Sequence, residues 1–216
     1  MLEQDRTSQT LAVGMSCLAG FVDALGFLGL GGVFISFMSG NSTRLAVGIS
    51  DPALFSAILP LSIIVLFVGG VMLGKIVRHH RPVCPSTAVL VFMLGIMICG
   101  GVSYELQHNA LAIAILAIAM GAANNVFVKE KEVSIGVTYM TGTLVKFGQR
   151  LVEKFLGEKD STCLPYFFLW LGLVLGAILG AIGYSYVGLR ALWVGTVFCG
   201  FLAWNFYLME SRGRSV

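Results

Sequence analysis

Long stretches of apolar residues, each nearly free of charge, recur along the whole chain. The clearest of them cover residues 11–30, 52–74, 86–103, 110–128, 163–187 and 191–209. A membrane-spanning helix needs about 20 consecutive apolar residues, and these stretches are of about that length. Charged residues make up 12% of the chain, which is about half of their usual share in soluble domains. The sequence therefore predicts an all-α integral membrane protein with a single membrane domain.

The chain offers no pattern for catalysis, metal binding or nucleic-acid recognition. It lacks the GxSxG, HExxH, P-loop and dinucleotide-binding motifs. The five cysteines are scattered, and His79 and His80 are neighbours that do not share a helix face. No basic region precedes the first apolar stretch, so we expect that stretch to remain as a span. We expect a protein that is not an enzyme, with no cofactor, no metal ion and no nucleic-acid partner.

Two further segments, residues 31–50 and 133–151, mix apolar and polar side chains. The first contains FISFMSGNSTRL and the second contains VTYMTGTLVKFGQRL. A shift of 102 positions places the first motif on the second, so that Arg44 falls on Lys146. A shift of 101 positions places Asp23 on Asn124, upstream of the motifs. A shift of 106 positions places a pair of glycines downstream of the first motif on a pair downstream of the second. The pattern predicts an internal repeat with halves at about 9–104 and 110–209.

The distribution of basic residues predicts how the halves are oriented. If both mixed segments enter and leave on the same side, about six spans remain. All but two of the 14 Lys and Arg residues then lie on one side of the membrane. Eight full spans, the alternative, would divide them more evenly. Because basic residues favour the cytoplasmic side, we expect six spans and two cytoplasmic termini. Three spans per half would make the repeats inverted, each with a broken or re-entrant segment.

Matching broken segments in inverted repeats indicate a binding site near the middle of the membrane. The candidate substrate-binding residues are Asp23, Ser39, Gly40, Asn41, Ser42, Arg44, Asn124, Asn125, Thr141, Gly142, Thr143 and Lys146. Helix N-termini at the two motifs, and the two basic residues, favour a small anionic ligand. A carboxylate inside a span, at Asp23, could bind and release a proton. The alternative is structural: the hydroxyls cap helices, Asp23 makes a local hydrogen bond, and the basic side chains reach the membrane surfaces.

Glycines four residues apart recur in both halves, as Gly70 with Gly74 and Gly176 with Gly180. This spacing lets two helices approach closely. The glycine faces would suit packing within the bundle, or a homodimer. We expect Gly74 and Gly180 to tolerate alanine but not leucine.

Three segments resemble the YoaK-like family of bacterial multi-pass membrane proteins: GFVDALGFLGLGGVFISFMSGNSTRLAVG, GAANNVFV and VSIGVTYMTGTLVKFGQRL. The resemblance covers nearly the whole chain. It implies a location in the bacterial inner membrane, in contact with the lipid bilayer, and carries over no site residue. From the residues themselves we expect a small secondary transporter or permease for a small solute. A channel-like pore is a variant of that hypothesis, and a non-transporting membrane scaffold or accessory subunit is the alternative.

Overall fold

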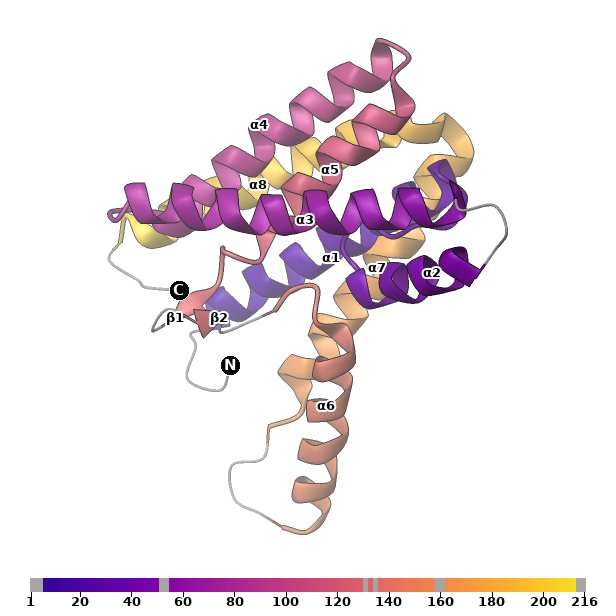
Figure 1. Cartoon of the computed structure of the whole chain (residues 1–216). Coiled ribbons are helices and arrows are strands. Elements are labelled where there is room, and N and C mark those ends of the chain that lie inside the picture. The colour runs from indigo at the N-terminus through magenta and orange to yellow at the C-terminus, as the bar shows by residue number, and fades with distance from the viewer. Residues whose placement is uncertain (1–5, 51–54, 130–131, 134–135, 158–161, 213–216) are drawn as a thin grey trace.

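A computed structural model describes residues 6–50, 55–129, 132–133, 136–157 and 162–212. Helices make up most of this chain (Figure 1). They are α1 (Arg6–Gly29), α2 (Met38–Ser50), α3 (Phe55–His80), α4 (Pro85–Glu105), α5 (Asn109–Ala123), α6 (Met140–Phe155), α7 (Leu164–Val187), the short 3-10 helix η1 (Gly188–Ala191) and α8 (Leu192–Glu210). The strands β1 (Val128–Lys129) and β2 (Glu132–Val133) form one short antiparallel pair. The predicted all-helical class is confirmed.

Four helical stretches of the described chain are long and apolar enough to cross a membrane. They are Thr7–Gly29, Ser56–His80, Pro85–Glu105 and Leu164–Glu210. The last one is 47 residues long and contains both α7 and α8, with η1 between them. The helix α5 is apolar but has only 15 residues. These helices confirm a multi-pass membrane protein.

Contacts between helix termini define two ends of the bundle. At one end, Ser8 Oγ in the first turn of α1 donates a hydrogen bond to Met209 Sδ in the last turn of α8, at 3.6 Å. Glu210, also in α8, accepts hydrogen bonds from backbone amides in the first turn of α4. At the opposite end, Arg190 of η1 pairs with Glu105, the last residue of α4, at 3.4 Å. Therefore α4 and α8 run antiparallel between the two ends.

The helices α1 and α7 cross at glycines, although they lie far apart in the sequence. A Cβ atom on Gly20 of α1 would overlap the carbonyl oxygen of Leu173 in α7. A Cβ atom on Gly176 of α7 would overlap the carbonyl oxygen of Cys17 in α1. Since only glycine leaves room for this approach, the two backbones are in direct contact at the crossing.

The helices α3 and α5 cross in the same manner. A Cβ atom on Gly70 of α3 would overlap the carbonyl oxygen of Ile118, and one on Gly121 of α5 would overlap that of Phe67. Ile118 and Gly121 of α5 lie 101 residues after Cys17 and Gly20 of α1. Leu173 and Gly176 of α7 lie 106 residues after Phe67 and Gly70 of α3. The glycines that the sequence pattern singled out therefore make contacts within the bundle.

The expectation that alanine is tolerated at Gly74 and Gly180 is wrong. A Cβ atom on Gly74 would lie 2.9 Å from Ala122 Cα, and one on Gly180 would lie 3.0 Å from Phe21 Cα. Both contacts are to backbone atoms of a neighbouring helix, which cannot move aside as a flexible side chain could. Even a methyl group must push the helices apart.

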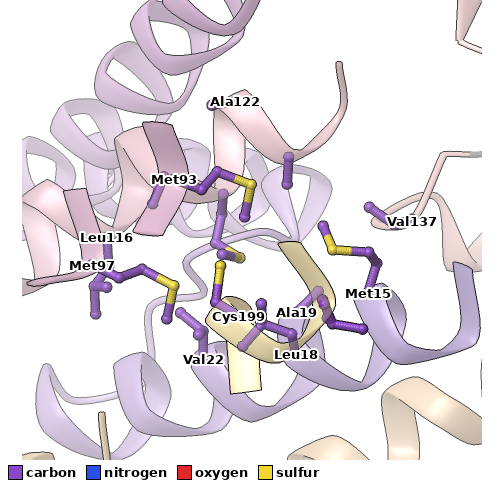
Figure 2. Packing of buried hydrophobic residues seen from close by; sticks show 14 of the residues in the cluster. Met15, Leu18, Ala19, Val22, Met93, Met97, Leu116, Ala122, Val137 and Cys199 are labelled. Atoms are coloured by element: carbon purple, nitrogen blue, oxygen red, sulfur yellow. The ribbon is translucent and has the colours of Figure 1, made fainter. Parts of the chain in front are cut away.

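Buried apolar side chains from several helices meet at the centre of the bundle (Figure 2). Met15 and Leu18 come from α1, Met93 and Met97 from α4, and Cys199 from α8, and further members of the cluster come from α3, α5 and α7. Many large apolar side chains on the outer faces are exposed, among them those of α3 and α7. An exposed apolar surface of this extent is suited to lipid. The core holds the inner faces together, and the outer faces remain available to the bilayer.

Candidate functional site

The helix α1 ends at Gly29, and the backbone from residue 30 to 37 is not helical before α2 begins. Asp23, one helix turn and a half before that end, binds this unwound segment. Its Oδ1 accepts hydrogen bonds from the backbone amides of Ile35 (2.7 Å) and Ser36 (2.6 Å). Its Oδ2 accepts one from Ser36 Oγ at 2.6 Å. Backbone groups in a membrane need partners inside the protein, and Asp23 supplies them for this break.

Asn41, near the start of α2, holds the same segment from the other side. Its side-chain amide donates to the carbonyl oxygen of Phe34 at 2.6 Å, and its Oδ1 accepts from the amide of Phe34 at 3.0 Å. The side chain is completely buried. Asn41 therefore satisfies both backbone groups of one unwound residue and faces the backbone rather than an open space.

Arg44 binds the start of the break. Its guanidinium donates to the carbonyl oxygens of Gly31, at 3.0 Å, and Gly32. Both glycines have positive φ angles, 67° and 100°, a conformation that suits glycine. The charge of Arg44 thus lies against the carbonyl ends at the terminus of α1, which is a favourable place for a cation.

The second break, between α5 and α6, has a related but weaker arrangement. Thr138 Oγ1 donates to Asn124 Oδ1 at 3.0 Å, and the side-chain amide of Asn124 donates to Met120 O at 3.2 Å. By the repeat, Asn124 is equivalent to Asp23 and Thr138 to Ser36. The neighbouring Asn125 donates to Val71 O of α3 at 3.0 Å. One polar pair therefore joins the helix end to the unwound segment in each half.

The two motifs meet at a cavity of about 310 Å³. Its lining consists of residues 36–39 from the first motif, residues 138–142 from the second, and Phe67. The N-terminal turns of α2 and α6 both border it, because α2 begins at Met38 and α6 begins at Met140. Among the predicted site residues, the structure brings Ser39, Thr141 and Gly142 together there. None of its lining residues carries a formal charge.

Asp23 borders a second cavity of about 660 Å³, which lies mainly between α1 and α7. Ser36, Phe37, Thr138 and Met140 line both cavities. Most of its other lining residues are apolar. The two cavities are therefore adjacent, and the hydrogen-bonded pair of Asp23 and Ser36 stands between them.

The remaining predicted site residues line neither cavity. Ser42 and Thr143 donate to the carbonyl oxygens four residues earlier in their own helices, at 2.9 Å and 3.1 Å. Lys146 is exposed on α6. Gly40 faces its own motif, since a Cβ atom there would lie 2.9 Å from the Phe34 ring and 2.7 Å from that of Phe37.

A further polar cluster, which sequence reasoning missed, joins four helix ends. Arg78 at the end of α3 donates to Ser86 Oγ and to the carbonyl oxygens of Asn125, Val126 and Val128 just beyond α5, at 3.0–3.2 Å. Glu210 of α8 accepts from the amides of Ser86 and Thr87 and from Thr87 Oγ1, at 2.6–3.0 Å. The sequence contained an indication of this cluster, because Arg78 and Glu210 both lie within a few residues of the end of an apolar stretch. Taken alone, however, charges at such positions indicate only how the spans are oriented.

The helices and breaks above define a polytopic α-helical membrane protein in which unwound segments border internal cavities. The chain belongs to the family described as "Protein of unknown function (DUF1275)", whose model matches residues 11–204.

Two curated relatives are similar to this chain. The UPF0700 transmembrane protein RA0705 of Rhizobium meliloti (strain 1021) is 32% identical over 200 residues, which cover 90% of this chain and 84% of the relative. The UPF0700 transmembrane protein YoaK of Bacillus subtilis (strain 168) is 27% identical over 156 residues, or 68% of this chain and 69% of YoaK. No solved structure matches the chain significantly. The resemblance to a YoaK-like family is confirmed.

Proposed function

We propose that this protein is a small secondary transporter, rather than an enzyme, and that its solute binds in the cavity between the two motifs. The observation that carries the proposal is the lining of that cavity, because residues 36–39 and 138–142 come from matching positions of the two halves. Broken helices that meet from two repeats are the usual construction of a transporter site. A volume of about 310 Å³ lies at the lower end of the range for pockets that bind small molecules.

The proposal includes an inverted repeat with six spans. Its support is the pairing of helices, since α1 packs on α7 while their equivalents α5 and α3 pack on each other. A twofold axis that relates the halves would exchange α1 with α5 and α3 with α7, and would therefore place one of these helix pairs on the other. Both termini would then lie in the cytoplasm of a bacterial cell, because Arg78, Arg81 and Arg212 lie at the end of the bundle where α1 begins and α8 ends.

For the solute we propose a small anion. The first turns of α2 and α6 leave backbone amides without helical acceptors, and the two helix dipoles add partial positive charge at the cavity. Arg44 and Lys146 do not line it, so the attraction would come from the backbone. Asp23, in the adjacent cavity, is the group that we propose for proton coupling.

Accessibility from both sides of the membrane tests transport without knowledge of the solute. The five native cysteines would be replaced, and Thr141→Cys would then be labelled with a membrane-impermeant maleimide in sealed vesicles of both orientations. A transporter that alternates its access should give labelling from each side, whereas Ser211→Cys, beyond α8, should be labelled from one side alone. Absence of labelling at position 141 from either side would favour the scaffold, and equal, fast labelling from both sides would favour a channel-like pore.

A pair of glycine variants on α6 tests the cavity itself. A Cβ atom added to Gly142 or to Gly148 would meet nothing within 4 Å, so leucine at each should fold. Only Gly142 lines the cavity. We expect Gly142→Leu to abolish solute-driven currents on a solid-supported membrane, tested with small carboxylates and inorganic anions, and Gly148→Leu to retain them. Equal currents in both variants would place the solute elsewhere.

A further inference from the structure

A groove of about 940 Å³ lies between α3 and α4. It lies at the end of the bundle that carries Arg78 and Glu210. Two neighbouring stripes form its walls: Ile76, Val77 and His80 on α3, and residues 87, 88, 91 and 92 on α4. It is separate from the cavity between the two motifs, with which it shares no lining residue.

The groove has an apolar floor and a basic rim. Val77, Ala88 and Phe92 are partly buried along its length. His80 and Arg81 are exposed at the mouth, where α3 ends and the chain turns into α4. No acidic residue is among its lining residues.

Glu210, the carboxylate that contacts the lining residue Thr87, does not neutralise this rim. Glu210 reaches the edge of the groove through Thr87, and its oxygens already accept hydrogen bonds from two backbone amides and the Thr87 hydroxyl. Arg81 forms no ion pair with the described residues. The rim therefore presents basic groups directly above an apolar channel.

We propose that the groove binds an anionic phospholipid from the bilayer. The rim would hold the phosphate and the floor would hold the upper part of the acyl chains. Ile76 and Val91 are 51% and 56% exposed, so the groove opens sideways toward lipid. Basic pockets between membrane helices at the cytoplasmic side recognise anionic headgroups in this way. A zwitterionic lipid of the same chain length would lack the charge that the rim attracts.

Native mass spectrometry of the full chain in neutral detergent can test the assignment with two probes. These are phosphatidylglycerol and phosphatidylcholine with the same acyl chains. We expect phosphatidylglycerol to bind several-fold more tightly. Arg81→Gln should reduce that preference about fivefold, since one basic residue near an anionic surface contributes about 1 kcal/mol. Arg190→Gln, an equal loss of charge at an exposed position on the opposite end, should leave the preference unchanged.

A variant that fills the floor separates a lipid site from general electrostatic attraction. Ala88→Phe should weaken the binding of both lipids, because the acyl chains lose their channel. Equal binding of the two lipids to the unaltered protein would overturn the proposal, as would an equal loss of preference in Arg81→Gln and Arg190→Gln. A dimeric mass that Ala88→Phe abolishes would also overturn it, since a second copy of the chain would then occupy the groove.

Discussion

Asp23 and Asn124 occupy equivalent positions, but they form different hydrogen bonds at the two helix breaks. Asp23 faces two backbone amides and one hydroxyl, all of them donors. A carboxylate, which only accepts hydrogen bonds when ionised, suits this set. Asn124 accepts from one hydroxyl and donates to a helix carbonyl, which suits an amide. The halves therefore share the position of the polar contact, while the side chain at each has adapted to its own partners.

Asn41 and Ser42 are adjacent, and both were predicted site residues, yet the structure gives them different roles. Asn41→Ala would leave the amide and carbonyl of Phe34 without partners in a buried place, at a cost of about 2 kcal/mol or more. Ser42→Ala removes an exposed hydroxyl bound within its own helix and should change stability by less than about 0.5 kcal/mol. Unfolding in mixed micelles would measure both variants. Similar losses of stability would contradict the role assigned to Asn41.

Sequence reasoning found the polar positions of the site but not the direction in which each side chain points. Asp23 and Asn41 stood out because polar groups are rare and unfavourable within apolar stretches. Whether such a group faces a cavity or a nearby backbone segment depends on shifts of a few ångströms, and no residue pattern encodes those. Arg44 is the clearest case, because its spacing from Gly40 matched that of Lys146, yet its guanidinium turns back to the end of α1.

At the scale of helices, the equivalent elements α2 and α6 are not held alike. The helix α2 packs along α3, where a Cβ atom on Gly48 would lie 2.7 Å from Ala57 N. In the described part of the chain, α6 packs against α7 alone, partly through the rings of Phe147 and Phe167, 5.6 Å apart. It projects away from the bundle, across the direction of α3 (Figure 1). Each helix thus packs on one neighbour, but α2 lies within the bundle while α6 extends away from it.

Adjacent glycines on α3 offer a controlled test of the helix crossings. Gly70→Ala should destabilise the protein by about 1–3 kcal/mol, because the methyl group meets the backbone of Ile118 and forces α3 and α5 apart. At Gly69 nothing lies within 4 Å of a methyl group, so Gly69→Ala should be neutral or stabilising through its better helix propensity. The midpoints of thermal unfolding in detergent compare the two. A similar midpoint for both variants would exclude a close crossing at Gly70.

The apolar stretches predicted the long helices well, and the mixed segments were correctly expected to contain a break. The positions of the breaks followed from the motifs, since α2 and α6 begin at the methionines two residues before Gly40 and Gly142. The sequence could not reveal that α5, with 15 residues, is much shorter than the apolar stretch at 110–128. Asn124 ends that helix early because its amide bonds back into the last turn.

For the whole molecule, the distribution of charge leads to a prediction of orientation. A reporter fused after Ser211 and one fused after Glu105 should give opposite signals, because α8 ends at one end of the bundle and α4 at the other. Activity of a cytoplasmic reporter is expected at Ser211, since Arg78, Arg81 and Arg212 lie at that end. An external signal at Ser211 would contradict the proposed orientation, and equal signals would contradict the six-span arrangement.

The crossing of α1 with α7 also has a consequence for how the protein is made. Gly29 and Leu164 lie 135 positions apart in the chain, so at ordinary rates of synthesis α7 emerges on the order of ten seconds after α1 is complete. During that interval the glycine face of α1 has no partner, whereas α3 meets α5 much sooner. The helix α1 is therefore complete long before its native neighbour α7 is made. Insertion machinery that released α1 early would expose its glycine face to unrelated helices, and a chain interrupted before α7 would leave this face permanently unpaired.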